Sequence, residues 1–267
     1  MLSRPVARRD LRLLVTPVTY CGSTQAQIKS MNITPQTTVG DIAAAFPLST
    51  RIFEDLGIDY CCGGKQALES ACAGKGLDPA AVIDRIQQPK PTPEASADWQ
   101  SMPLNLLIDH ILSAHHAYMK AQLPRLSAML NKILAIHSER HGAVLLPLAG
   151  TFRAMRTELD SHLLKEEMVL FPLIRRLESA GGEAPNFHCG SLRNPIRVMT
   201  MEHDSAGDAL ARMRELTGGY TPPAGACETF RAFYAELADM ERNLHQHIHL
   251  ENNILFPRAV ELETVAS

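Results

Sequence analysis

The sequence has few aromatic residues, no strong charge of either sign and no long apolar run. Aromatic residues make up 5% of the 267 residues, and the alternating β-branched and aromatic side chains that indicate strands are missing after residue 20. The net charge is −3, from 26 basic and 29 acidic residues, and no basic stretch interleaved with aromatics indicates nucleic-acid binding. No apolar run approaches the roughly 18 residues that span a bilayer. These absences favour an all-α protein, without nucleic acid or membrane as a partner.

The six cysteines show no spacing typical of a disulfide framework. Cys61 and Cys62 are adjacent and precede Gly63 and Gly64, which predicts a tight turn before a helix that begins near Lys65. A helix N-terminus and a lysine both favour the thiolate form. The pair is therefore a candidate catalytic dithiol in a reducing compartment. The alternative is a structural turn with incidental thiols, and two thiols alone do not complete a metal site.

Composition and turn signals divide the chain into four segments. Residues 1–32 carry arginines and an apolar stretch too short for a secretory signal, which predicts a disordered extension or an artefact of the start codon. Residues 33–88 predict a small helical domain, residues 89–99 a Pro-rich, semi-rigid linker with a hinge, and residues 100–262 a helical bundle. In the small domain we expect short helices at about Thr38–Phe46, Pro47–Gly57, Lys65–Ala73 and Pro79–Gln87.

Two segments of the predicted bundle align without a gap. They run His-Leu-Leu-Lys-Glu-Glu-Met-Val-Leu-Phe-Pro at 162–172 and His-Ile-His-Leu-Glu-Asn-Asn-Ile-Leu-Phe-Pro at 247–257. Each carries a histidine and a glutamate four residues apart, which places both on one helix face within one turn. Two further helical stretches carry a lone histidine each. We therefore predict two similar helical hairpins, each supplying one lone histidine and one His-x-x-x-Glu pair.

The ionisable residues of these helices lie on otherwise apolar stripes, whose spacing alternates between four and three as on a buried face. The stripe of the second helix runs Leu148, Phe152, Met155, Leu159, His162, Glu166, Val169 and Leu173. Across the four stripes the ionisable residues are His116, His162, Glu166, His203, His247 and Glu251. His110 and His115 lie close by, and the stripe favours His116. A lone histidine on such a face is more often a core residue than a ligand, but buried unpaired carboxylates are costly and a metal accounts for all six.

Four imidazoles and two carboxylates without a thiolate suit iron, manganese or zinc. Six side chains are too many for one tetrahedral ion, and too few for two octahedral ions unless the carboxylates bridge. We predict two ions, each bound by two histidines and joined by Glu166 and Glu251, with room for an oxo or hydroxo bridge. Ferritin-like bundles use Glu-x-x-His, so the order and spacing here disfavour a ferritin-like oxidase.

Two unrelated motifs carry a resemblance to known proteins. The segments at 162–172 and 250–257, with Met-Glu-His-Asp at 201–204, resemble the hemerythrin-like di-iron bundle. Asp-Tyr-Cys-Cys-Gly-Gly-Lys-Gln at 59–66 resembles the iron–sulfur cluster repair family (RIC, also called ScdA or YtfE). The resemblance, over about residues 33–262, implies an antiparallel four-helix bundle with a small N-terminal helical domain. It also implies two non-haem iron ions with oxo or hydroxo and carboxylate bridges, held by the residues that match the six above.

The resemblance implies a role in the stress response. We expect a cytoplasmic di-iron protein that repairs iron–sulfur clusters damaged by nitrosative or oxidative stress, through nitric oxide binding, iron delivery or both. Its partners would be damaged iron–sulfur proteins, with nitric oxide or oxygen as small ligands. A nitric oxide reductase at the same irons, and an oxygen or nitric oxide carrier or sensor, stay open as alternatives. The fifth histidine of an oxygen-carrying hemerythrin is not evident. The oligomeric state also stays open, with a homodimer as one alternative.

Overall fold

The computed structural model describes residues 31–88, 98–180 and 190–266. In these residues every named element is a helix, and the one β-type contact is an isolated bridge between Thr38 and Ala67. The predicted all-α class is therefore confirmed. No helix within the described ranges is long and apolar enough to cross a membrane. The predicted extension 1–32 and the predicted linker 89–99 lie almost entirely outside the described residues, so both stay predictions.

The N-terminal described segment forms four short helices. They are α1 (Val39–Ala45), α2 (Ser49–Leu56), α3 (Leu68–Ala73) and α4 (Pro79–Gln87). The Thr38 side chain caps α1 by accepting from the backbone N–H of Asp41, and Gly57 ends α2 with φ of 64°. Helices α1, α2 and α4 begin and end close to where the turn signals predict. The exception is α3, which begins three residues after Lys65 because Gly63–Gln66 forms a hydrogen-bonded turn first.

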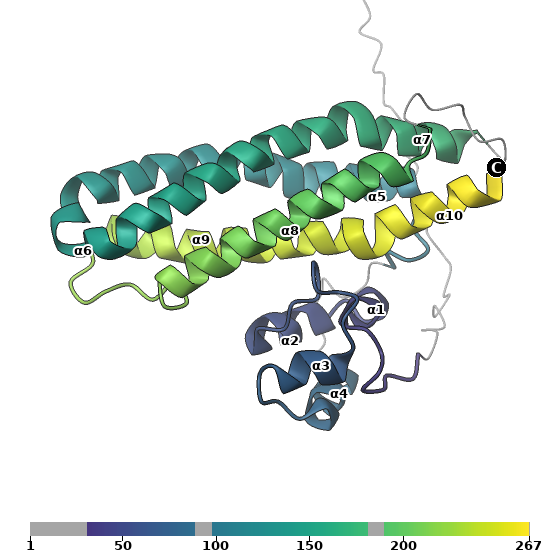
Figure 1. Ribbon diagram of the computed structural model, residues 1–267, viewed down its shortest axis with the longest axis horizontal. Helices are drawn as coiled ribbons and strands as arrows, with labels where there is room; N and C mark the ends of the chain where they lie inside the picture. Colours follow the sequence, from purple (N-terminus) through teal and green to yellow (C-terminus); the bar gives the residue numbers. More distant parts are fainter. Residues whose placement is uncertain (1–30, 89–97, 181–189, 267) are drawn as a thin grey trace, which may run out of the picture. The chain divides into compact units, whose positions relative to one another are not determined.

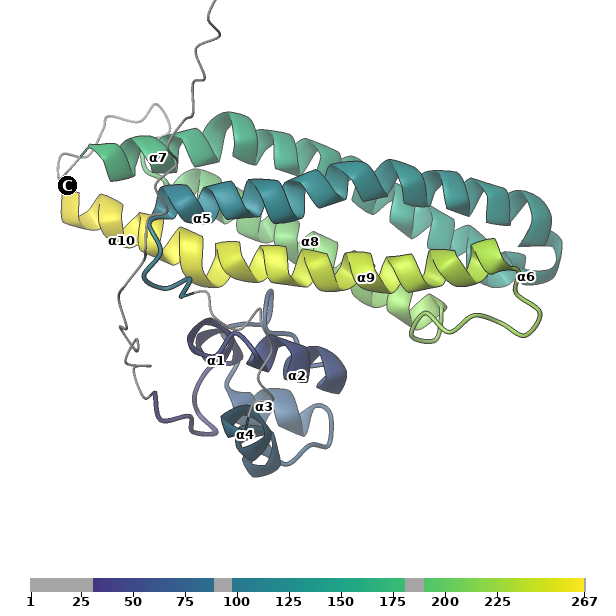
Figure 2. The same cartoon turned by 180° about the vertical axis from the view of Figure 1, so that it is seen from behind.

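The remaining helices form a bundle, and Figures 1 and 2 show its four long helical stretches lying side by side. The first stretch consists of α5 (Leu104–His110), η1 (Ile111–His116) and the first arm of α6 (Ala117–Lys165). The second consists of the second arm of α6, η2 (Glu166–Leu170) and α7 (Phe171–Ser179). The others are α8 (Arg193–Leu216), followed by α9 (Glu228–Leu250), η3 (Glu251–Leu255) and α10 (Phe256–Ala266). Helix α6 spans both arms of the first hairpin, and the non-helical residue His141 (φ −122°, ψ 16°) marks the reversal between them.

Three π-helical turns interrupt the bundle helices, and each contains a predicted ligand. His116 ends η1, while Glu166 and Glu251 begin η2 and η3. The backbone N–H that follows each turn donates five residues back, for example from Phe171 to the carbonyl of Glu166. Pro172 is the second residue after η2, and a proline can neither donate nor tolerate the carbonyl four residues earlier. Such π turns occur frequently at functional sites.

The π turn η2 changes which residues face the core. The predicted stripe continues from Glu166 to Val169 and Leu173, but Val169 is 40% exposed and Leu173 is only half-buried. Leu170 and Ile174 are buried instead. The predicted stripe is therefore wrong by one residue beyond Glu166, because a π turn holds one residue more than an α turn.

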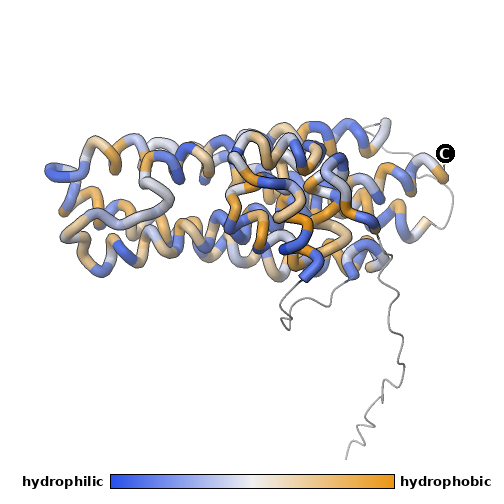
Figure 3. Tube along the Cα trace, turned by 90° about the horizontal axis from the view of Figure 1, so that it is seen from below, coloured by the Kyte–Doolittle hydropathy of each residue, from blue (hydrophilic) through white to orange (hydrophobic). Residues whose placement is uncertain are grey.

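Apolar side chains fill the bundle on both sides of the six predicted ligands. Figure 3 shows hydrophobic and hydrophilic residues alternating along each bundle helix, as amphipathic helices require. Towards one end lie the buried Ile111, Phe171, Ile174, Ile254 and Phe256. Towards the end where α6 reverses lie the buried Leu123, Phe152, Leu210 and Leu237. The ionisable residues between these layers are shielded from water.

Candidate metal centre

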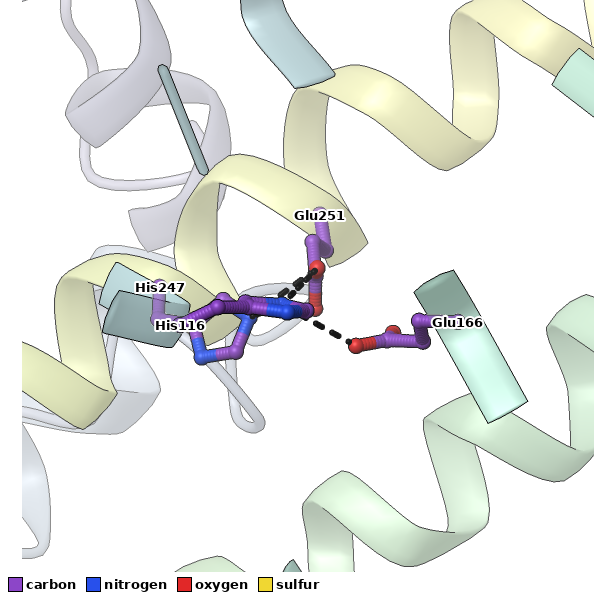
Figure 4. A group of neighbouring side chains, drawn as sticks. All are labelled: His116, Glu166, His247 and Glu251. Atoms are coloured by element: carbon purple, nitrogen blue, oxygen red, sulfur yellow. Dashed lines mark hydrogen bonds and ion pairs between the residues drawn. The ribbon is translucent and has the colours of Figure 1, made fainter. Parts of the chain in front are cut away.

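The six predicted ligands converge from all four long helical stretches in the middle of the bundle. Two overlapping groups have their ligand atoms close enough to hold a metal ion: His116, Glu166, His247 and Glu251, and His162, Glu166, His203 and Glu251. All six residues are buried, and both glutamates have 0% exposed surface. Figure 4 shows the side chains of the first group pointing toward one another. Both glutamates belong to both groups, as bridging carboxylates would.

The ligand atoms have the separations of atoms around a cation. The Nε2 atoms of His162 and His203 are 3.0 Å apart, and those of His116 and His247 are 3.1 Å apart. Glu251 places Oε1 3.0 Å from His247 and Oε2 3.1 Å from His203. Glu166 Oε2 lies 3.4 Å and 3.3 Å from Nε2 of His116 and His162. Two ligands each about 2.1 Å from one ion are about 3.0 Å apart when they meet at a right angle.

Unpartnered buried oxygens support a metal at this position. Both oxygens of Glu166 and Oε2 of Glu251 have no hydrogen-bond partner among the described residues. Burial opposes the ionisation of Glu251, but the imidazoles of His247 and His203 outweigh it and hold the pKa of this carboxyl well below its usual range. A buried carboxylate without hydrogen bonds costs several kcal/mol, roughly, and a bound cation removes that cost. The donor set of imidazole and carboxylate fits iron, manganese or zinc.

Three of the four imidazoles form a hydrogen bond to another side chain through Nδ1, the ring nitrogen that faces away from the centre. The Nδ1 atom of His116 donates to Glu167 Oε1 (2.8 Å), and that of His162 donates to Glu202 Oε2 (2.8 Å). The Nδ1 atom of His203 donates to Asn252 Oδ1 (2.9 Å). A proton fixed on Nδ1 leaves the Nε2 lone pair free to face a metal, and such partners increase the basicity of the ligand. These partners each follow or precede a ligand in the sequence. The stripe analysis missed them because polar neighbours of a ligand break the apolar pattern.

Two lysines form ion pairs with Glu167 and Glu202, the two carboxylates that accept from the histidines. Lys120 Nζ lies 2.6 Å and 2.7 Å from the two oxygens of Glu167, and Lys165 Nζ pairs with Oε1 of Glu202. Each imidazole–carboxylate–lysine chain runs from the buried centre to the surface. The burial of His162 by itself lowers its pKa, but Glu166 outweighs this and raises the pKa to about 9 in the metal-free chain.

His115 belongs to neither metal group. Its Nδ1 lies 3.1 Å from Asn243 Oδ1, and its ring is stacked on that of His247 with centroids 5.6 Å apart. Burial, followed by the neighbouring His247, lowers the pKa of His115 to about 4. Of the two neighbouring histidines, the structure brings His116 to the centre, as the stripe predicts.

The thiol pair lies in a loop that one carboxylate organises. Asp59 accepts from the backbone N–H groups of Cys61 and Cys62 at 3.0 Å each, and from that of Gly63 at 2.9 Å. The two Sγ atoms are 3.9 Å apart. The hydrogen bond to Cys62, burial and the charge of Asp59 together raise the pKa of the Cys61 thiol well above its ordinary value. The predicted thiolate is therefore wrong for Cys61, because the helix N-terminus begins only at Leu68 and the nearest charge is negative.

The same loop contacts the helices that carry the predicted ligands. The Cys62 thiol donates to the backbone carbonyl of His203 at 3.3 Å, and its Sγ would lie 3.2 Å from a Cβ on Gly207 of α8. A cavity of about 330 Å³ lies beside both thiols, and its lining includes Asp204 and Asp208. The thiols are thus neighbours of the metal-ligand helices in space, although a predicted linker lies between them in the sequence.

Comparison with known proteins agrees with this geometry. Residues 107–259 match the model of the hemerythrin HHE cation binding domain, and residues 35–90 match a domain of unknown function named ScdA_N. The chain is 39% identical over 222 residues to the iron–sulfur cluster repair protein YtfE of Edwardsiella ictaluri, covering 83% of this chain and 96% of the relative. It is 38% identical to the protein of the same name from Pectobacterium atrosepticum (84% and 97% covered), and 40% identical to that of Yersinia pseudotuberculosis (84% and 97%).

Proposed function

We propose, from the premise that this chain belongs to the family of hemerythrin-type iron–sulfur cluster repair proteins, that it repairs iron–sulfur clusters damaged by nitrosative or oxidative stress. Its partners are damaged iron–sulfur proteins, and its site of action is the cytoplasm. The observation that carries the proposal is the pair of buried four-residue groups that share Glu166 and Glu251. Shared carboxylates are what a two-metal centre needs.

In this proposal the two positions hold one iron each. His116 and His247 would hold one ion and His162 and His203 the other, and Glu166 and Glu251, which belong to both groups, would be shared between the two ions, with room for an oxo or hydroxo bridge. Iron bound there supplies electron transfer and an open position for nitric oxide or oxygen. The chain's own residues orient three of the four imidazoles, because Glu167, Glu202 and Asn252 accept from the Nδ1 atoms of His116, His162 and His203, and the apolar layers exclude water.

Cys61 and Cys62 are the residues that we assign to contact with the damaged cluster. Cys62 is the more exposed of the two, and both thiols line the 330 Å³ cavity. A thiolate can ligate an iron that a damaged cluster releases, whereas a hydroxyl at the same position would do so poorly. The contact between Cys62 and the backbone of His203 supports a short path between this dithiol and the two-metal centre.

The test is to purify the protein with its metal, measure iron per chain, and record the ultraviolet–visible spectrum. The iron-loaded protein is then incubated with an iron–sulfur enzyme that nitric oxide has inactivated. We expect two irons per chain, the absorption of a bridged di-iron centre, and recovery of the damaged enzyme. Protein with two irons that restores no activity would contradict the repair function, and protein with zinc or no metal would contradict the di-iron centre.

Two other functions use the same centre. A nitric oxide reductase would convert nitric oxide to nitrous oxide on repeated turnover, which gas analysis of the reduced protein measures directly. An oxygen carrier would need a fifth histidine ligand. Among the described residues, only four histidines belong to the two metal groups, and His115 hydrogen-bonds to Asn243 instead. This observation favours repair over oxygen carriage.

A further inference from the structure

The four imidazoles of the metal centre are not held equally. At one position, His162 and His203 both donate through Nδ1, to Glu202 and Asn252. At the other position, only His116 has such a partner, Glu167. The Nδ1 atom of His247 is buried and has no hydrogen-bond partner among the described residues. The two positions thus differ by one outer hydrogen bond.

The surroundings of His247 do not replace the missing partner. The side chain is fully buried, and the neighbouring His115 presents its ring face, nearly parallel at an angle of 5°. The Nδ1 of His115 is already engaged with Asn243. An imidazole without an acceptor on its outer nitrogen is a weaker base and a less firmly oriented ligand. Loss of one such partner typically lowers metal affinity about 10–100-fold.

The same position is also the one that a cavity reaches. A cavity of about 480 Å³ is lined by the ligand His116 together with Ala117, Lys120, Glu167 and Phe171, among others. The cavity beside the thiols has no metal-ligand side chain in its lining. Glu167 therefore has two roles at the position of His116. It accepts a hydrogen bond from Nδ1 of His116, and together with Lys120 it lines the 480 Å³ cavity that reaches the His116 ring.

We infer that the position formed by His116 and His247 is the exchangeable one. It takes up its metal last and releases it first, through the cavity beside Glu167 and Lys120, while the position of His162 and His203 retains its metal. This inference rests on the proposed two-iron centre and specifies which of the two irons is available for delivery. Glu167 acts as a positioning residue for His116, and Asn252 does so for His203.

The test follows the release of ferrous iron from the loaded, full-length protein to an excess of a coloured chelator. We expect two phases with one iron each. Glu167→Ala should accelerate the fast phase about 10-fold and leave the slow phase unchanged, and Glu167→Gln, which keeps an acceptor for Nδ1, should restore the wild-type rate. Asn252→Ala should accelerate the slow phase instead. Asn243→Ala, whose partner His115 is not a ligand, is the matched control and should change neither phase.

The route is tested separately from the ligands. Ala117 is exposed and lines the 480 Å³ cavity, so Ala117→Trp should narrow it and slow the fast phase only. Wild-type protein that holds two irons but releases both in one phase would overturn the inference and leave the proposed function intact. So would acceleration of the fast phase by Asn252→Ala. Wild-type protein that holds fewer than two irons would overturn the proposed function itself.

Discussion

The side-chain amide of Asn253 donates a hydrogen bond to the backbone carbonyl of Tyr60, 3.1 Å away. Asn253 belongs to the π turn η3, two residues after the predicted ligand Glu251, and Tyr60 directly precedes the thiol pair. A second hydrogen bond, from the same Nδ2 to Nδ1 of His249, fixes the amide orientation. The turn that carries Glu251 and the loop that carries the thiols are therefore joined by one side chain.

Asn253→Ala should loosen the thiol loop without removing a metal ligand. The variant loses the bond to Tyr60, so Cys62 should react faster with a thiol reagent, by about 5-fold if the lost bond contributes about 1 kcal/mol. Iron content should stay at the wild-type value. Asn131→Ala, which removes an exposed contact to Arg153, is the control and should leave the labelling rate unchanged. Equal labelling rates in Asn253→Ala and wild type would show that this bond does not hold the loop.

Gly64→Ala should destabilise the protein. A Cβ there would lie 2.6 Å from Asn253 Oδ1 and 3.0 Å from the Tyr60 carbonyl, so the backbone of the loop must shift. We expect the free energy of unfolding to fall by about 1–3 kcal/mol, as for overpacking in a core. Gly150→Ala in α6 meets no atom within 4 Å and should stabilise by up to about 1 kcal/mol, because alanine is the better helix former. Denaturant unfolding measures both, and a stable Gly64→Ala variant would contradict the close packing.

Ligand variants should distinguish His116 from His115. His116→Ala, His162→Ala and His247→Ala each remove an Nε2 that faces the centre, so each should lose at least one iron per chain. His115→Ala removes a ring outside both metal groups and should retain two irons. Metal analysis of the purified variants is the measurement. If His115→Ala is the damaging change and His116→Ala is not, the ligand assignment is out of register by one residue.

The double variant Cys61→Ser with Cys62→Ser should separate iron binding from repair. Neither thiol belongs to a metal group, so iron content and the spectrum of the centre should be unchanged. Recovery of a damaged iron–sulfur enzyme should fall at least 10-fold, because serine is a poor ligand and nucleophile at neutral pH. Cys227→Ser, whose thiol contacts His137, serves as the control. Repair at the wild-type rate by the double variant would assign the function to the two-metal centre alone.

Acid should destabilise the fold partly through His249. Burial lowers the pKa of this histidine from 6.5 to about 4, so it stays neutral in the folded chain. Below pH 6.5 the unfolded chain binds a proton that the folded chain does not. The contribution of His249 to stability is therefore complete above pH 6.5 and declines as the pH falls toward 4, by about 3 kcal/mol in all. The stability of His249→Gln should fall less steeply over this range than that of the wild type, as urea unfolding at several pH values would show. Parallel curves for the two proteins would contradict this assignment.

The sequence predicts which six ionisable side chains converge in the bundle, because each of the four long helical stretches carries its own local pattern. Ionisable residues on apolar stripes mark burial, and the i, i+4 spacing of His162 and Glu166 marks a shared face. The stripe fails beyond Glu166 because it assumes a constant α-helical period, and the π turn η2 breaks that assumption.

Other features depend on packing between distant segments, which no local pattern contains. The contact of Cys62 with the His203 carbonyl joins residues 141 apart in the sequence. The raised pKa of Cys61 comes from Cys62, burial and Asp59 together, whereas the sequence argument used only a helix start and a lysine. Partners such as Asn252 are adjacent to ligands in the sequence, but only the folded bundle shows which imidazole each one reaches.

The π turns also make the orientation of the helices that follow them depend on the number of residues in each turn. One extra residue in a helix rotates everything after it by about 100° relative to an uninterrupted helix. In η2 this rotation turns Leu170 and Ile174 inward and leaves Val169 outside, while Glu166 still faces the centre. Deleting one exposed residue of η2, such as Val169, would remove no predicted ligand and no core side chain. It would nevertheless rotate the apolar face of α7 away from the core, so an insertion or deletion in η2 or η3 would have consequences that a substitution there would not.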